Sequence, residues 1–207
     1  MTTILIIVIV FFVLSLLVRV FTQYLFEKRW ITYEIKKGNH FSELKGWFWK
    51  KIKINLEENN VLDFKVVLTE SCLYDAKKVG QHINKLYGVA CGQHHENSIR
   101  IGWRCESIIY GRFSLWAYCY NNGKLKYELL GHTYIDNVER LRVEISESEM
   151  TAKLINDDNY PTVIAQHTEY LEQQRDCPKL GRYKLFPYFG GEAVAPHNME
   201  IKIYEIE

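Results

Sequence analysis

The sequence predicts an all-β fold: a two-sheet sandwich of the jelly-roll or concanavalin-like type with one short helix, preceded by a single transmembrane helix. Apolar and polar residues alternate with a period of two along most of the chain after residue 47, a pattern typical of half-buried strands. Turn residues separate these runs at short intervals, as they do in sandwiches and barrels. A single open sheet of roughly ten strands would leave a face and two edges exposed, so two packed sheets are expected.

The first element is the apolar segment of residues 4–26, in which Ser15 is the only polar residue before Arg19. At ~1.5 Å per residue, a helix of this length crosses a ~30 Å hydrocarbon core, and Arg19 near its end can reach the headgroups. A cleaved signal peptide is the alternative, but no basic residue precedes the segment and no Ala-x-Ala-like site follows it. We therefore expect residues 1–26 to be a retained anchor in the lipid bilayer and residues 27–207 to form the β-sandwich domain.

The charges that flank this segment predict the side of the membrane on which the domain lies. Several basic residues follow the apolar core, whereas only the amino terminus is positive before it. The positive-inside rule then places the domain in the cytoplasm. The five cysteines show no Cys-x-x-Cys spacing and no dense framework, so reduced and mostly buried thiols are expected.

The composition excludes two classes of protein. Lys and Arg total 26 against 25 Asp and Glu, which gives a formal net charge of +1, whereas nucleic-acid-binding proteins usually show a clear basic excess. Hydrophobic residues make up 47% of the chain and aromatic residues 14%, too much apolar material for a disordered chain. We therefore expect a folded core and no nucleic-acid partner.

Alternating apolar residues predict the strands of the sandwich in chain order. Each row places its apolar side chains on one face and its polar ones on the other. The rows lie at residues 52–56, 62–68, 99–105, 113–119, 125–129, 141–145, 150–154 and 199–203. Asn121-Asn122-Gly123 separates two of them, and an Asn-Gly pair between alternating runs is a strong β-hairpin signal.

One helix is expected over residues 75–88, where Asp75 can cap the start and Gly88 can end the helix. The apolar residues at helical spacing within it are Val79, Ile83 and Leu86. A second helix candidate is residues 169–175. It lies in the polar stretch 157–179, where alternation is poor and two prolines occur, so an irregular excursion is expected there.

A polar cluster between two strand-like runs supplies the first candidate site. It contains His94, His95, Asn97 and Arg100, and residues 94–98 are expected to form a turn. Imidazole, amide and guanidinium groups that converge at a sheet edge can bind an anion or a sugar, or take part in acid–base chemistry. The alternative is a polar turn whose side chains hydrogen-bond only local backbone.

No metal site or other cofactor is expected. His94 and His95 are adjacent and would point to opposite faces of a strand, and zinc sites need three or four converging ligands. Nucleophile elbows, P-loops, dinucleotide fingerprints, HExxH motifs and EF-hand loops are absent from the sequence. We therefore assign no catalytic residue.

The second candidate site is an aromatic row. Trp116, Tyr118 and Tyr120 alternate along one strand, opposite its small core-facing residues, and form a platform about 13 Å long. Such a row can stack sugar rings. The alternative is that another part of the chain or another protein covers it, since large apolar patches are rarely left exposed.

The run of residues 185–197 is aromatic and rich in turn-forming residues, with two prolines and an adjacent pair of glycines. Proline and glycine mainly mark turns. We therefore expect a structural corner that leads the chain into its last strand.

Four segments together resemble a group of uncharacterised bacterial proteins with a predicted β-sandwich. The resemblance covers residues 60–207 and implies the all-β fold without an activity. The segments read NKLYG at 84–88, GxHHxNSxRxGW at 92–103, YxYNNG at 118–123, and LFPYFGG followed by APH within 185–197.

The chain is also similar, over two short pieces, to jelly-roll polysaccharide lyases. Those enzymes carry a Gln-x-His strand and a Tyr-Phe-Lys strand, and Gln93-His94-His95 and Tyr188-Phe189-Gly190 match parts of them. Glycine occupies the lysine position here, and no Arg-Ser/Thr-Glu-Leu-Arg-like strand occurs.

Two functional hypotheses follow. The first is a membrane-tethered binding or interaction module without catalysis, with a glycan or a protein as its partner. The alternative is a carbohydrate-active enzyme of the polysaccharide-lyase type, or a glycan-binding domain, that uses His94 or His95 with Tyr188 and Arg100. A cytoplasmic domain conflicts with both glycan hypotheses, because polysaccharides lie mostly outside the cytoplasm.

Overall fold

The computed structural model describes residues 30–45, 61–157, 161–171 and 182–206. The chain divides after Ile31 into two units, and the fold described is that of the second. The expected membrane helix and the expected strand at residues 52–56 lie outside the described residues. Within the described ranges, no helix has the length and apolar character needed to cross a bilayer.

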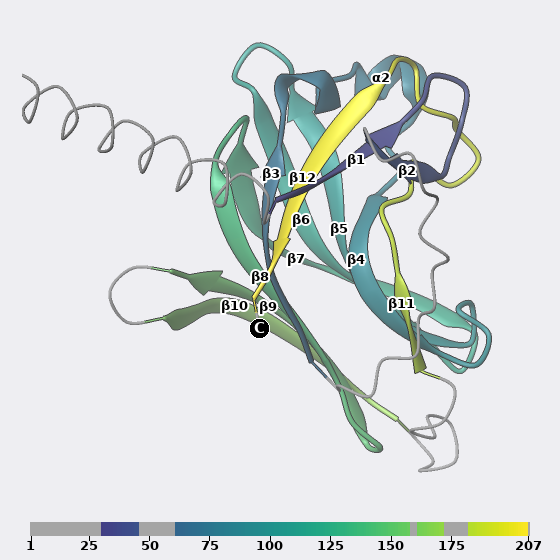
Figure 1. The fold of residues 1–207 in the computed structure, drawn as a ribbon. Coiled ribbons are helices and arrows are strands. Elements are labelled where there is room, and N and C mark those ends of the chain that lie inside the picture. Colours follow the sequence, from purple (N-terminus) through teal and green to yellow (C-terminus); the bar gives the residue numbers. More distant parts are fainter. Residues whose placement is uncertain (1–29, 46–60, 158–160, 172–181, 207) are drawn as a thin grey trace, which may run out of the picture. The chain divides into compact units, whose positions relative to one another are not determined.

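The larger sheet has seven strands in the order β10-β9-β8-β3-β12-β1-β2 (Figure 1). Its strands are β1 (Ile31–Ile35), β2 (Ser42–Leu44), β3 (Val61–Leu68), β8 (Val138–Ile145), β9 (Glu149–Asn156), β10 (Thr162–Tyr170) and β12 (Met199–Glu205).

The smaller sheet has five strands in the order β11-β4-β5-β6-β7, and each of its neighbouring pairs is antiparallel. Its strands are β4 (Asn84–Cys91), β5 (Asn97–Ser107), β6 (Arg112–Asn121), β7 (Lys124–Tyr134) and β11 (Arg182–Leu185). The predicted all-β, two-sheet sandwich with one short helix is confirmed.

The core lies between the two sheets, where the predicted apolar rows meet. Ile99, Ile101 and Trp103 of β5 and Leu115 of β6 are fully buried, as is Phe64 of β3 on the opposing sheet. Their polar neighbours along β5 and β6 are left on the outer face of the smaller sheet. Strand alternation therefore determines which side chains can form a site on that face.

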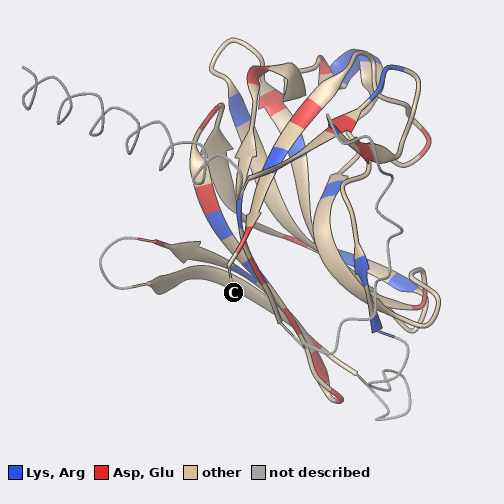
Figure 2. Ribbon diagram, in the orientation of Figure 1, with Lys and Arg blue, Asp and Glu red and all other residues tan. Residues whose placement is uncertain are grey.

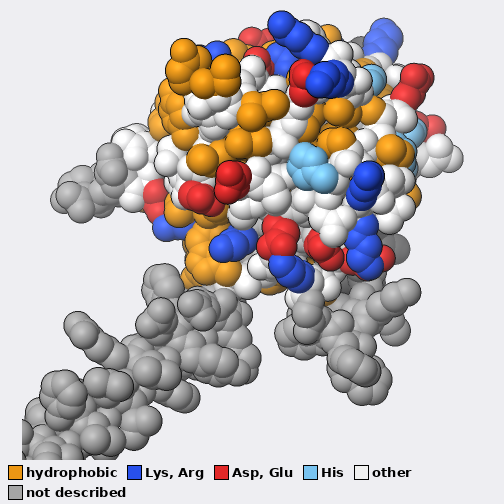
Figure 3. Space-filling view, turned by 90° about the horizontal axis from the view of Figure 1, so that it is seen from above, with side chains coloured by type: hydrophobic (Ala, Val, Ile, Leu, Met, Phe, Trp, Pro, Cys, Tyr) orange, Lys and Arg blue, Asp and Glu red, His pale blue; other side chains and the backbone are white. Residues whose placement is uncertain are grey.

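The row at residues 125–129 departs from this pattern. The strand exists as β7, but Leu125, Tyr127 and Leu129 are 43%, 56% and 42% exposed and face outward. β7 is an edge strand, so it pairs on one side only. Figure 3, which views the sandwich from above, shows hydrophobic side chains exposed elsewhere too.

The predicted β6–β7 hairpin is confirmed by its backbone angles. Asn122 and Gly123 have φ values of 50° and 74°, and a two-residue type I′ turn requires positive φ at both positions.

The predicted helix is wrong in extent. Asp75 does cap it, by accepting a hydrogen bond from the Lys77 backbone N–H at 3.0 Å, but α2 covers only Ala76–Val79. Gly80, with φ 108°, ends it. The next residues form β4, which pairs with β5 and β11 on its two sides, and this tertiary pairing outweighs the local helical spacing. One 3₁₀ turn, Glu70–Cys72, precedes the helix.

The irregular excursion expected over residues 157–179 is also corrected. Thr162–Tyr170 forms β10, which pairs with β9 at the edge of the larger sheet. The first two residues of the expected helix at 169–175 belong to this strand, and residues 172–175 lie outside the described ranges. A register shift between Val163 and Ala165 interrupts the alternation, as bulges on edge strands do.

The cysteines follow the expectation only in part. Cys72, Cys105 and Cys119 are free and buried. Cys91, however, is disulfide-bonded, and its partner lies outside the described residues. The expectation that every thiol is reduced is therefore wrong for Cys91.

We expect the three free thiols to resist alkylation while the domain is folded. Burial raises the pKa of Cys72 and of Cys119 to about 12 and also raises that of Cys105, and the thiol form is unreactive. Mass spectrometry after iodoacetamide treatment should find these three sites unlabelled in native buffer and labelled in urea. Rapid native labelling of all three would contradict the packing described.

Candidate functional site

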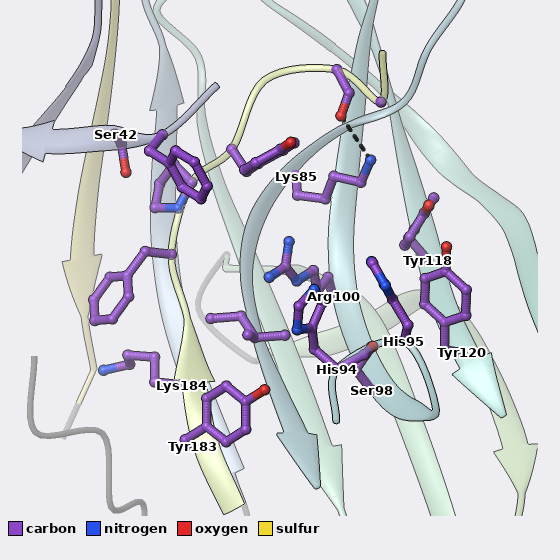
Figure 4. A pocket seen from close by; sticks show the side chains of 17 residues that line it. Ser42, Lys85, His94, His95, Ser98, Arg100, Tyr118, Tyr120, Tyr183 and Lys184 are labelled. Atoms are coloured by element: carbon purple, nitrogen blue, oxygen red, sulfur yellow. Dashed lines mark hydrogen bonds between the residues drawn. The ribbon is translucent and has the colours of Figure 1, made fainter. Parts of the chain in front are cut away.

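A cavity of about 510 Å³ lies on the outer face of the smaller sheet. Its floor is built by outward-facing residues of β4, β5, β6 and β11, and its wall by Phe41, Ser42 and the segment of residues 186–191. Figure 4 shows these side chains converging around Arg100. Backbone pairing holds the wall to the floor, because Tyr188 and Lys85 exchange hydrogen bonds of 2.8 and 3.0 Å.

Arg100 lies at the centre of this floor because of its neighbours in the sheet. Arg100 belongs to β5 and pairs with Gly88 of β4 on one side and with Tyr118 of β6 on the other. A Cβ at Gly88 would lie 2.4 Å from the Arg100 Cγ and 2.2 Å from the Ile99 carbonyl oxygen. The missing side chain at Gly88 therefore gives the Arg100 side chain its space.

A register shift brings a second cation to the same floor. β4 has one more residue than β5 between the pairs Lys85–Gly102 and Gly88–Arg100. Such a bulge changes the alternation locally, and it lets both Lys85 and Gly88 lie on the cavity side of the sheet.

The two cations differ in their partners. The Lys85 ammonium donates a hydrogen bond to the Gly190 carbonyl oxygen at 3.0 Å and lies 4.6 Å from the centre of the Tyr118 ring (Figure 4). Burial, together with the charge of Arg100, lowers the pKa of Lys85 to about 8. Burial lowers the pKa of Arg100 to about 10, so its guanidinium stays charged at neutral pH.

Lys85 and Arg100 have no acidic partner in the described part of the chain, unlike Lys184, which also lines the cavity and pairs with Glu205. Among the residues that the structure describes, no carboxylate forms an ion pair with Lys85 or Arg100, and the described lining contains neither Asp nor Glu. The cavity is therefore positively charged and suited to an anion.

Aromatic and imidazole rings surround these cations. Tyr118, Tyr120, Tyr183 and Tyr188 line the cavity. Burial raises the pKa of Tyr118, so its hydroxyl keeps its proton and can donate a hydrogen bond.

The two histidines stand beside the tyrosines. Their rings lie 4.1 Å apart, and that of His95 lies 5.2 Å from that of Tyr120. The pKa of His94 is lowered, chiefly by burial and also by His95 and Arg100, so His94 is neutral at neutral pH. Both rings line one cavity because they lie in the turn before β5 rather than in a strand.

The structure brings together most of the predicted ligand-binding residues. His94, His95, Arg100, Tyr118 and Tyr120 all line the cavity. Within the described residues, no group of His, Cys, Asp and Glu could hold a metal ion.

Asn97 and Trp116 do not line the cavity. Asn97 is buried, and its side-chain oxygen accepts a hydrogen bond from the Asn122 backbone at 3.0 Å, which ties two turns together. Trp116 lies on the same outer face as Tyr118, but its indole N–H donates to Ser114 and the Arg104 guanidinium lies 5.2 Å from its ring. The Asn97 side chain therefore makes the local contact that the alternative of a polar turn described.

Sequence patterns did not identify Lys85 and Tyr183 as members of this binding site, whereas Tyr188 was expected there only through the resemblance to jelly-roll polysaccharide lyases. Lys85 falls in the segment expected to be helical, and its position depends on a bulge that has no local signal. Tyr188 belongs to the predicted corner, where Gly190 has a φ of 66° and donates its N–H to the Asn84 side chain at 2.6 Å. The pair of glycines was the available signal, since it marks a backbone that approaches another segment closely.

No protein-family model matches the chain, and neither does any curated protein. Among solved structures, the alginate lyase from Klebsiella pneumoniae is similar with a TM-score of 0.54 and 9% identity, over 71% of this chain. The alginate lyase AlyC3 is similar with a TM-score of 0.50 and 12% identity, over 85% of this chain and 73% of its own. This chain spans 58% of the length of the Klebsiella lyase. The likeness shows a shared jelly-roll fold.

Proposed function

We propose that this domain binds an acidic glycan and that Arg100 holds the carboxylate of a uronate sugar. The observation that carries the proposal is a half-buried, charged guanidinium without a carboxylate partner among the described residues, at the centre of a cavity lined by tyrosines. The planar guanidinium fork matches a carboxylate, to which it can donate two parallel hydrogen bonds.

Another half-buried arginine of the same chain is paired with carboxylates. Arg140, on the outer face of the larger sheet, donates to both carboxylate oxygens of Asp63, at 3.0 and 2.9 Å, and to Asp157 at 2.8 Å. Lys and Arg are interspersed with Asp and Glu along that sheet (Figure 2). A buried charge left without a partner is costly. Arg100 has no carboxylate partner among the described residues, which favours an anion that comes from outside the chain.

The remainder of the cavity favours a sugar over a simple anion. Its volume of about 510 Å³ falls in the range of small-molecule sites. Tyrosine rings offer flat surfaces to the apolar face of a sugar ring, and Ser98 and the two imidazoles can hydrogen-bond hydroxyls. Two solved structures with this fold are named alginate lyases, which agrees with a polysaccharide ligand.

The disulfide bond of Cys91 gives evidence on the cellular compartment of the domain. Cys91 is disulfide-bonded, and structural disulfides are typical of proteins outside the reducing cytoplasm. An external domain would also meet polysaccharides. We therefore place the domain outside the cytoplasm, against the orientation that the flanking charges predict, and we retain the membrane anchor as part of the proposal.

Replacing Arg100 should remove the affinity for uronates. We expect the full chain to bind an alginate tetrasaccharide and not the uncharged cellotetraose in isothermal titration calorimetry. Arg100→Gln should weaken alginate binding by about ten-fold or more, because a charge-assisted bidentate contact is lost. Arg112→Gln, an exposed position outside the cavity, is the control. Equal binding of the neutral sugar, or an unaffected Arg100→Gln variant, would refute the proposal.

Cleavage by β-elimination is a second candidate function, favoured by the neutral His94 and the protonated Tyr118 beside Arg100. With the carboxylate neutralised by Arg100, His94 would take the proton from the adjacent ring carbon. The electrons of that C–H bond form a carbon–carbon double bond as the neighbouring carbon–oxygen glycosidic bond breaks. Tyr118 donates its proton to the leaving oxygen, and solvent later returns a proton to Tyr118 and removes one from His94.

This second function has its own assay. A lyase acting on alginate releases an unsaturated sugar that absorbs in the ultraviolet. His94→Ala should abolish that absorbance while alginate binding stays within about two-fold, since a group that acts only in the transition state contributes little to binding. If the unaltered chain binds alginate and produces no unsaturated sugar, the second candidate is wrong and binding alone remains.

A further inference from the structure

A second cavity, of about 220 Å³, adjoins the first on the outer face of the smaller sheet. The two share Lys85, Tyr118 and Gly191 in their linings. Tyr118 of β6 pairs with Tyr127 of the neighbouring strand β7. Tyr127 lines the second cavity and not the first. The two cavities therefore follow one another across the strands β5, β6 and β7.

The spacing suits neighbouring units of one ligand. Arg100, Tyr118 and Tyr127 occupy consecutive strands at paired positions. Because neighbouring strands lie about 4.8 Å apart, Arg100 and Tyr127 are about 10 Å apart at their Cα atoms. A single sugar ring seated at Arg100 does not reach Tyr127, whereas the next unit of a chain does.

Of the two cations that line the second cavity, Arg104 is ion-paired. Arg104 donates from two of its nitrogens to the same Glu106 carboxylate oxygen, at 3.1 and 2.8 Å. That oxygen also accepts from the Ser114 hydroxyl at 2.6 Å. Lys85 borders both cavities, but its ammonium is bound to the carbonyl of Gly190, which lines only the first. The guanidinium of the second cavity is therefore ion-paired, whereas Arg100 in the first has no carboxylate partner among the described residues.

What the second cavity offers instead is an exposed ring with neutral polar groups beside it. Tyr127 is 56% exposed and Leu125 43% exposed. Gln81 and His82 line the same cavity, and an amide and an imidazole can both donate and accept hydrogen bonds. A flat apolar surface with neutral hydrogen-bonding groups suits a sugar that carries hydroxyl or amide groups and no charge.

We infer that the ligand is a mixed glycan chain in which a neutral sugar adjoins the uronate, the uronate at Arg100 and the neutral sugar on Tyr127. This inference rests on the proposed function, because it takes the first cavity to be the uronate site. It restricts the substrate class, since a chain made only of uronates would place a second carboxylate where Arg104 is already paired with Glu106.

The test compares tetrasaccharides of equal length on the full chain. The probes are a hyaluronan tetrasaccharide, in which glucuronate alternates with N-acetylglucosamine, an alginate tetrasaccharide, and free glucuronate. We expect the hyaluronan tetrasaccharide to bind about five-fold or more tightly than the alginate one, as a stacking contact allows. Tyr127→Ala should abolish this preference and leave the affinity for free glucuronate unchanged. Gln81→Ala, at an exposed position, should likewise weaken the binding of the hyaluronan tetrasaccharide.

Tyr134→Ala is the matched control, because Tyr134 is a 49% exposed tyrosine of the same strand outside both cavities. Alginate binding as tight as hyaluronan or tighter would overturn the inference and leave the proposed function standing. An unchanged preference in Tyr127→Ala would also overturn it. If neither tetrasaccharide nor glucuronate binds, the proposed function itself fails, and the inference with it.

Discussion

The charge of Arg100, held in a cavity without a carboxylate among the described residues to balance it, is the constraint on which the site depends. The surrounding sheet accommodates it by specific means. Gly88 leaves space for the Arg100 side chain. The described residues that line the cavity around Arg100 include tyrosine and histidine rings and no Asp or Glu. A sheet selected only for stability would pair this arginine with carboxylates, as the larger sheet pairs Arg140. Because binding sites commonly retain costly groups that their ligands satisfy, the arrangement indicates a ligand.

The two cavities on the outer face of the smaller sheet differ in whether their arginine has an acidic partner. Arg100 and Arg104 both point outward from β5, four residues apart, yet only Arg104 has an acidic partner in the described structure. β5 therefore carries one guanidinium without a described acidic partner, at Arg100, and one ion-paired guanidinium, at Arg104. Lys85 lies between them, and its lowered pKa of about 8 makes its contribution to the positive field smaller in alkaline solution.

The sequence allowed the sandwich and part of the site to be predicted, because both depend on strand alternation. The inward row of β5 defines the core, and the same period places Arg100 and Tyr118 on the opposite face. Lys85 could not be predicted, because it reaches the site through a bulge. Tyr188 pairs with a distant segment, and it was expected at the site only through the resemblance to polysaccharide lyases. The extent of the helix failed for the same reason, since its last expected turn is a strand paired on both sides.

The most direct test is the free energy of unfolding of Arg100→Met, measured with urea in the absence of any glycan. Since a half-buried charge without a carboxylate partner among the described residues does not stabilise the fold, we predict a variant at least as stable as the unaltered chain that no longer binds uronates. Arg140→Met, which removes two hydrogen bonds to Asp63 and leaves those from Arg142 in place, should lose about 1–3 kcal/mol. A comparable loss in Arg100→Met would contradict the central claim, because it would show that the charge serves the fold rather than a ligand.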